Sequence, residues 1–148
     1  MKFTNGFWLM REGFDVLYAA QAYSTRIKHA AAGDSVSALV TPKVINHRGA
    51  TLNIATLNVD LDAPAPDVIR VRVAHHTGGT PALKFPVTQT ESGAVANASE
   101  SYTTLTSGGL TAKLHTGTEW NLEFIAEDRV LTHQRSRSLA IVNDADGK

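Results

Sequence analysis

Two aspartates separated by one residue have a spacing that could support chemistry. Asp60 and Asp62 lie in a run that alternates apolar and polar residues, so a β-strand would place both carboxyl groups on one face, roughly 7 Å apart at Cα. Hydrolysis of a glycosidic bond uses two carboxyl groups, which lie about 5–5.5 Å apart in a retaining enzyme. Ala63 and Pro64 follow at once, however, and acids at the end of a strand are more often solvated than catalytic. We therefore predict that this pair is not catalytic.

The other acidic residues and the histidines lack the spacing of a reactive site. Four acids alternate with apolar residues near the end of the chain, which predicts the solvated face of a hairpin: Glu119, Glu123, Glu127 and Asp128. The six histidines include no pair at the four-residue spacing of a helical zinc site. His75 and His76 are adjacent, so in a strand they would point to opposite faces. We predict that this chain holds no metal-binding residues.

Nucleophilic and phosphate-binding motifs give no stronger signal. The sequence has no glycine-x-serine-x-glycine motif, and its serines lie in contexts that resemble turns. The pairs Gly78-Gly79 and Gly108-Gly109 lack the helix and lysine that follow a phosphate-binding loop, so we interpret them as turns. The sequence therefore predicts no catalytic residues and no cofactor.

The aromatic residues allow two interpretations. Aromatic faces can stack on sugar rings, and the candidates for such a platform are Trp8, Trp120, Tyr18, Tyr23 and Tyr102. Aromatic side chains of a β-sandwich more often fill its core, and the sequence does not show whether any two are coplanar. The core interpretation is therefore preferred.

Composition indicates a globular domain whose net charge does not favour binding to nucleic acid or to an anionic membrane. The 148 residues are 43% hydrophobic and carry 14 basic and 14 acidic side chains, so no net charge attracts nucleic acid or an anionic membrane. There is no cysteine, which is compatible with the cytoplasm. The first ten residues lack the pattern of a secretory signal, and no run approaches the roughly 20 apolar residues of a membrane span. We expect a cytoplasmic domain.

Alternation with a period of two predicts an all-β, antiparallel fold. The clearest strand is Val68–Ala74, with Ile69, Val71 and Val73 facing the core and Arg70 and Arg72 on the opposite face. Thr51–Leu61 predicts another strand with a bulge at Ala55-Thr56, and the two prolines of Asp62–Asp67 predict a connecting loop.

Further strands are expected on both sides of this region. Ala19–Ala32 is rich in alanine, but Tyr23, Thr25 and Ile27 favour an extended segment that continues through Ser35–Val40. The pattern predicts a hairpin formed by Leu110–Leu114 and Trp120–Ala126. After it we expect a turn at Glu127-Asp128 and strands at Val130–Thr132 and Leu139–Val142. The segment Thr88–Thr106 gives only weak strand signals, at Val95, Tyr102 and Leu105.

Five segments, in this order, carry a resemblance to a known family. They are the opening Met1–Ile27, the strand and turn Asp67–Gly79, the proline-containing segment Lys84–Val87, the segment Ser107–Leu114 and its partner Gly117–Phe124. Together they resemble the amino-terminal part of bacterial α-xylosidases and related α-glucosidases of glycoside hydrolase family 31. The resemblance implies a galactose-mutarotase-like β-sandwich, also called a supersandwich, as one amino-terminal domain spanning residues 1–148.

The same resemblance implies that the catalytic residues lie elsewhere. Enzymes of this family carry them in a (β/α)8 barrel, which alone needs roughly 250 residues. Their nucleophile lies in a tryptophan-x-aspartate-methionine motif, whereas Trp8 and Trp120 precede Leu9-Met10 and Asn121-Leu122. The implied partners are the remainder of the same polypeptide, with its barrel, and an α-linked glycoside.

Three functional hypotheses follow. The first is an accessory domain of a retaining α-glycosidase that packs on the barrel and helps to shape its substrate pocket. The second is a stand-alone carbohydrate-binding β-sandwich, and the third is a small hydrolase that uses Asp60 and Asp62. A domain that packs on a barrel leaves an apolar surface when alone, so we expect Phe7, Trp8 and Phe14 to contribute to it and homo-oligomers to be possible.

Overall fold

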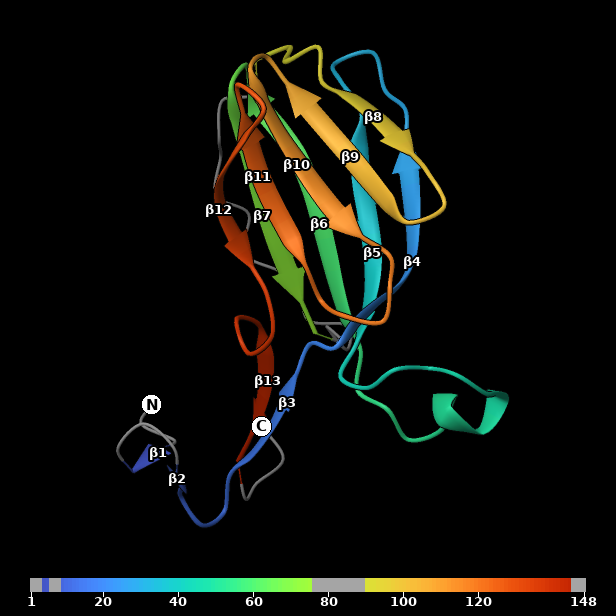
Figure 1. The fold of residues 1–148 in the computed structure, drawn as a ribbon, viewed down its shortest axis with the longest axis vertical. Coiled ribbons are helices and arrows are strands. Elements are labelled where there is room, and N and C mark those ends of the chain that lie inside the picture. The colour runs from blue at the N-terminus through green and yellow to red at the C-terminus, as the bar shows by residue number, and fades with distance from the viewer. Residues whose placement is uncertain (1–3, 6–8, 76–89, 145–148) are drawn as a thin grey trace.

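The alternating runs build two antiparallel sheets that pack face to face (Figure 1). The computed structural model describes residues 4–5, 9–75 and 90–144. One sheet has the order β4-β5-β6-β7, formed by β4 (Gln21–Lys28), β5 (Ser35–Thr41), β6 (Leu57–Ala65) and β7 (Val68–Ala74). The other has the order β12-β11-β10-β9-β8, formed by β8 (Val95–Ala98), β9 (Tyr102–Ser107), β10 (Leu110–His115), β11 (Leu122–Ala126) and β12 (Arg129–Gln134). The prediction of an all-β, antiparallel sandwich is confirmed.

A two-stranded ribbon and a loop project from one end of the sandwich (Figure 1). The ribbon pairs β3 (Asp15–Tyr18) with β13 (Ala140–Asn143), so segments from the two ends of the chain lie side by side. Two short strands, β1 (Thr4–Asn5) and β2 (Leu9–Met10), pair near the ribbon. The loop between β5 and β6 contains the 3-10 helix η1 (Arg48–Thr51). We call this the ribbon end.

The core lies between the inner faces of the two sheets. Its largest completely buried aliphatic side chains come from β5, β6, β9, β10 and β11: Val36, Val40, Val59, Leu61, Leu105, Leu114 and Leu122. Most of them alternate with polar residues, so nearly every second side chain of these strands enters the core. Trp120 and Ile141 join the same cluster at the ribbon end.

At the opposite end, two turns link the sheets. The backbone N–H of Gly109 donates to Oδ1 of Asp67 at 2.6 Å, and the Ser107 hydroxyl donates to the Ala65 carbonyl at 3.2 Å. Asp67 has a φ of 60° and Gly108 a φ of 57°, and a Cβ at Gly108 would collide with the Asp67 carboxylate. The turn between β9 and β10 therefore requires glycine at this position.

The prediction for residues 51–67 was wrong at both ends. Residues 51–56 belong to η1 and the loop after it, where Leu52 is 69% exposed, and the strand begins at Leu57. The first four residues of the expected loop, Asp62–Ala65, instead belong to β6, and only Pro66 and Asp67 form the connecting turn to β7. The register shifts between Asp62 and Ala65, and a bulge of this kind accommodates a proline that cannot donate to the ladder.

Most other strand predictions are confirmed. β7 has the predicted bounds, and the alanine-rich segment forms a strand, β4, rather than a helix. Val73 lies opposite the buried Val59 but stays 43% exposed, because β7 is the edge strand of its sheet. Trp120 precedes β11, which begins at Leu122. Within the described residues, no helix has the length and apolar character needed to cross a membrane.

The core assignment predicts different effects for one substitution at two leucines. Leu105→Ala removes a completely buried side chain and should lower the free energy of unfolding by about 2–5 kcal/mol. Leu52→Ala removes a mostly exposed side chain and should change it by less than about 0.5 kcal/mol. Chemical denaturation of both variants measures the difference, and equal effects would contradict the assignment.

Candidate functional site

Asp60 and Asp62 lie on the outer, solvent-facing side of the four-stranded sheet. Leu61 between them points into the core, so the two aspartates share the opposite face, as the sequence predicted. The register pairs Asp60 with Arg72 and Asp62 with Arg70 on the neighbouring strand β7.

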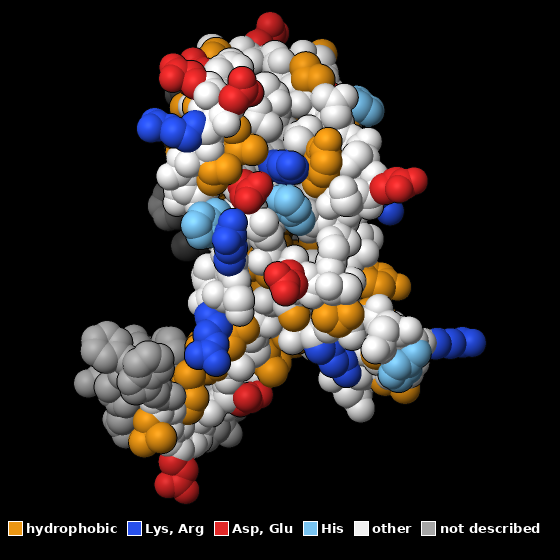
Figure 2. Space-filling view, viewed as in Figure 1, with side chains coloured by type: hydrophobic (Ala, Val, Ile, Leu, Met, Phe, Trp, Pro, Cys, Tyr) orange, Lys and Arg blue, Asp and Glu red, His pale blue; other side chains and the backbone are white. Residues whose placement is uncertain are grey.

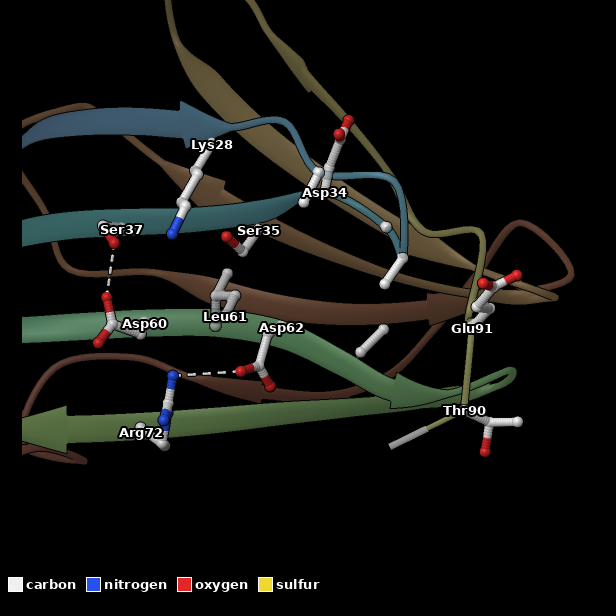
Figure 3. A pocket seen from close by; sticks show the side chains of 14 residues that line it. Lys28, Asp34, Ser35, Ser37, Asp60, Leu61, Asp62, Arg72, Thr90 and Glu91 are labelled. Atoms are coloured by element: carbon white, nitrogen blue, oxygen red, sulfur yellow. Dashed lines mark hydrogen bonds and ion pairs between the residues drawn. The ribbon is translucent and has the colours of Figure 1, made fainter. Parts of the chain in front are cut away.

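Two arginines and a serine bind this aspartate pair, and Figure 3 shows the contacts of Arg72 and Ser37. Arg70 donates to both oxygens of Asp62, at 2.8 and 2.7 Å, and Arg72 adds a bond of 3.2 Å. The bond to Asp62 raises the pKa of Arg70, and the Ser37 hydroxyl donates to Asp60 at 2.6 Å. Both oxygens of Asp62 thus accept from guanidinium groups, so it is not arranged to give a proton to a leaving group. The arrangement is an ion-pair network rather than an acid and a nucleophile.

The groove around these aspartates has a volume of about 620 Å³. It also contains Lys28, Asp34 and Glu91 (Figure 3). Asp34 accepts from the Ala96 N–H at 2.9 Å and pairs with His29, and these contacts lower the pKa of its carboxyl. No aromatic side chain is among the described residues that line the groove. Its chemistry is that of a polar surface without a stacking face for a sugar.

A second polar cluster, which the sequence did not predict, lies on the outer face of the five-stranded sheet. Charged and histidine side chains gather near the middle of this face (Figure 2). Glu123 on β11 lies within 3.1 Å of the His115 ring and 3.6 Å of the Arg135 guanidinium, and Asn121 donates to it at 3.4 Å. The register places Lys113 and His133 on either side of Glu123. We call this group the Glu123 cluster.

The contacts of Glu123 hold its carboxyl in the ionised form. The hydrogen bond from His115 is the largest cause of a lowered pKa, and it outweighs the opposing effect of burial. Only 14% of the Glu123 side chain is exposed, so the predicted solvated position was wrong for this residue. Glu119, Glu127 and Asp128 are exposed as predicted. The partners of Glu123 described here include no second carboxyl, so they do not form the acid pair of a glycosidase.

The aromatic candidates do not form one platform in the described part of the chain. Trp120 is 2% exposed and fills the core, which confirms the preferred interpretation for that residue. Tyr102 on β9 and Tyr18 on β3 have cations over their rings, from Lys113 at 4.4 Å and Arg137 at 5.8 Å. Tyr23 is exposed on β4, in the other sheet. Trp8 lies outside the described residues.

A second cavity, of about 650 Å³, is lined by residues of β3 and of the segments just before β11 and just after β12, where the ribbon joins the sandwich. Its lining includes Tyr18, Glu119, Trp120, Asn121, Arg135 and Arg137. Two of its lining residues each have a polar atom that is buried without a hydrogen-bond partner, the indole Nε1 of Trp120 and the amide Oδ1 of Asn121. An unpaired buried group of this kind costs about 1–3 kcal/mol of stability. We call it the junction cavity.

The remaining sequence predictions concern metals and turns. The described residues contain no group of three or more histidine, aspartate or glutamate side chains arranged to hold a metal ion. Gly108-Gly109 forms the predicted turn, between β9 and β10. His76, Gly78-Gly79 and the aromatics Phe7 and Trp8 lie outside the described residues.

Comparison with known proteins supports the resemblance stated above. The chain is 27% identical to α-xylosidase XylQ of Lactiplantibacillus pentosus over 148 residues, which are all of this chain and 19% of that protein. It is 34% identical to an α-xylosidase of Emericella nidulans over 79 residues, which are 53% of this chain and 10% of that protein. The chain is similar to an α-xylosidase along its full length. It spans less than a fifth of either relative, and no protein-family model matches it.

The lowered pKa of Glu123 predicts a pH-dependent effect of its removal. Glu123→Gln should reduce the free energy of unfolding by about 1–2 kcal/mol near pH 7, because charge-assisted hydrogen bonds are lost. A depressed carboxyl pKa stabilises the folded chain above the ordinary value of 4.5, and this contribution is lost as the pH falls through the folded-state pKa.

Denaturation of the wild-type chain and the variant between about pH 7 and pH 3 measures this difference. The difference in free energy of unfolding between wild type and Glu123→Gln should disappear near pH 3. Glu127→Gln, the same change at an exposed turn, is the matched control and should show no gap. A gap for Glu123→Gln that stays constant with pH would contradict the assignment.

Proposed function

We propose that this chain is an accessory domain of an α-xylosidase-like glycosidase and that it packs against the remainder of that polypeptide through its ribbon end. In this proposal residues 1–148 form one domain, and glycosidic bonds are cleaved by carboxyl groups of a catalytic barrel outside it. The observation that carries the proposal is the match of the whole chain to a small part of an α-xylosidase.

The side chains described above support a non-catalytic role. Asp62 is bound to two arginines and Glu123 to a histidine, an amide and an arginine. A retaining glycosidase instead needs one carboxyl that gives a proton and a second that attacks the sugar. Neither acid has a second carboxyl among its hydrogen-bond partners within the described residues, so a small hydrolase built on Asp60 and Asp62 is disfavoured.

The ribbon end supports the proposed contact with the remainder of the polypeptide. β3 and β13 form a separate two-stranded sheet, and paired strands of this kind are marginally stable alone in water. Two of the most exposed apolar side chains, Leu9 at 66% and Leu52 at 69%, lie on the segments that project there. Burying these side chains and the ribbon against a further layer would stabilise them.

The stand-alone sugar-binding hypothesis receives less support. A stacking platform needs exposed and unoccupied aromatic faces, whereas Trp120 is buried and two tyrosines have cations over their rings. Tyr23 alone of the described candidates lacks these features.

A chimeric enzyme tests the proposal. The matched segment of the Lactiplantibacillus pentosus α-xylosidase is replaced by this chain, and hydrolysis of an aryl α-xyloside is measured. We expect the chimera to be soluble and to retain activity, because the inserted sandwich presents the same packing surface. This chain alone should release no product above the buffer background.

Two controls give the result its meaning. Deletion of the segment should abolish soluble, active enzyme, and so should its replacement by an unrelated β-sandwich of similar length. An inactive chimera beside an active deletion variant would overturn the proposal. Hydrolysis by this chain alone that is lost in Asp60→Ala or Asp62→Ala would support the small-hydrolase hypothesis instead.

A further inference from the structure

β7 is the edge strand of the four-stranded sheet, and its outer edge has no partner among the described strands. Alternate residues of an antiparallel strand direct their backbone N–H and C=O groups to the same side, so about half of these groups in β7 point away from β6. From Arg70 to Ala74 the pairing with β6 is regular, without a bulge. The unpaired groups therefore form a template on which another extended segment can pair.

The other three edges of the sandwich are protected against strand addition. β8 has only four residues. The pairing of β4 with β5 shifts between Ala22 and Ser24, and that of β12 with β11 shifts between Phe124 and Ile125. Short strands and bulges are common protection of a sheet edge. β7 has seven residues, no proline and β-branched side chains on its inner face, so it is the best template of the four edges.

The two sheets are offset, so one side of the larger sheet extends past the smaller one. The contacts between them join β4 to β8, β5 to β9, β6 to β9 and β7 to β10. Because β11 and β12 follow β10 in the five-stranded sheet, they lie beyond β7. A further strand beside β7 would lie opposite β11 and pack against Phe124, whose side chain is only partly buried.

Val73 marks the same position from the smaller sheet. It shares the inner face with Val59, its cross-strand partner, which is completely buried. Val73 is nevertheless 43% exposed, because no described strand lies beyond β7. A strand in this position would remove apolar surface of Val73 from water, which stabilises the folded chain.

The outer face of β7 selects the chemistry of that strand. It carries Arg70 and Arg72, to which β6 offers Asp62 on one side (Figure 3). Arg72 donates to Asp62 from Nη2, at 3.2 Å, and its side chain stays 59% exposed. Other N–H groups of its guanidinium are therefore open to a carboxylate. A strand with apolar residues inward and acidic residues outward would complement this edge.

The same charges favour one source for the strand. A second copy of β7, paired antiparallel about Val71, would place Arg70 opposite Arg72, and like charges directly opposite destabilise a sheet. Residues 76–89, which follow β7 in the chain, contain two prolines and no acidic residue. The charges thus favour a segment of the remaining polypeptide.

We propose that an extended segment of the remaining polypeptide pairs with the outer edge of β7 and widens the four-stranded sheet to five strands. Its apolar side chains cover Val73 and Phe124, and its acidic side chains lie beside Arg72. The inference rests on the proposed function, because it takes the segment from that polypeptide. To the contact at the ribbon end it adds a backbone-paired contact along one edge of the sandwich.

Hydrogen–deuterium exchange of the β7 amides, resolved by residue, tests the pairing in the chimeric enzyme. In the free chain, protected and unprotected amides should alternate along β7 because only one edge is paired. In the chimera the unprotected amides should exchange at least about tenfold more slowly. Arg72→Gln should reduce this gain, whereas Arg26→Gln, at an exposed position of β4 on the opposite edge of the same sheet, should leave it unchanged.

A pair of valine substitutions gives an independent readout. Val73 and Val130 are similarly exposed, at 43% and 45%, so Val73→Lys and Val130→Lys should each leave the free chain folded. In the chimera, Val73→Lys places a charge under the added strand and should lower the midpoint temperature of inactivation by several degrees. Val130→Lys, on β12, should leave that temperature unchanged.

The outcomes separate this inference from the proposed function. An active chimera in which the β7 amides exchange as in the free chain, or in which both lysine variants behave alike, would refute the added strand and leave the accessory-domain proposal standing. An inactive chimera beside an active deletion variant would overturn both. Protection of every β7 amide in the free chain would show that this chain fills its own edge, and protection that rises with its concentration would identify a second copy. Either result overturns the inference.

Discussion

The structure depends on the burial of two inner sheet faces against each other. Neither sheet can cover its own apolar side, and the completely buried leucines and valines come from both, with Leu61 in one sheet and Leu105 in the other. Once every second residue enters this core, the residues between them must face outward. This constraint places Asp60 and Asp62 on one outer face and Glu123 on the other.

The outer faces use their charges mainly for internal pairing. Arg70 and Arg72 bind Asp62, and His115 and Arg135 bind Glu123, so both groups of charges are satisfied within their own sheets. The turns opposite the ribbon are likewise joined, through Asp67 and Gly109. The ribbon end carries the two most exposed large apolar side chains of the described residues, Leu9 and Leu52. The proposed contact with the remainder of the polypeptide belongs to this end.

Local patterns in the sequence predicted much of this fold. The alternation of apolar Ile69 and Val71 with Arg70 predicted the bounds of β7 correctly. The β-branched and aromatic residues of β4 predicted a strand there despite its alanines. The errors arose where a tertiary contact decided the outcome. Pro64 stays in β6 because a bulge accommodates it, and Glu123 is enclosed because side chains from neighbouring strands converge on it. The unpaired Trp120 Nε1 gives no sequence signal, because it depends on which acceptors the fold brings near.

The central claim is that the sandwich contacts a larger polypeptide through its ribbon end. Hydrogen–deuterium exchange measures this most directly, by comparing backbone amides of this chain alone with those of the same residues in the chimeric enzyme. The account predicts that protection increases in β3, in β13 and in the loop that contains η1, while β9 and β10 exchange as before. Protection concentrated on the outer face of either sheet, or no change at the ribbon end of an active chimera, would contradict it.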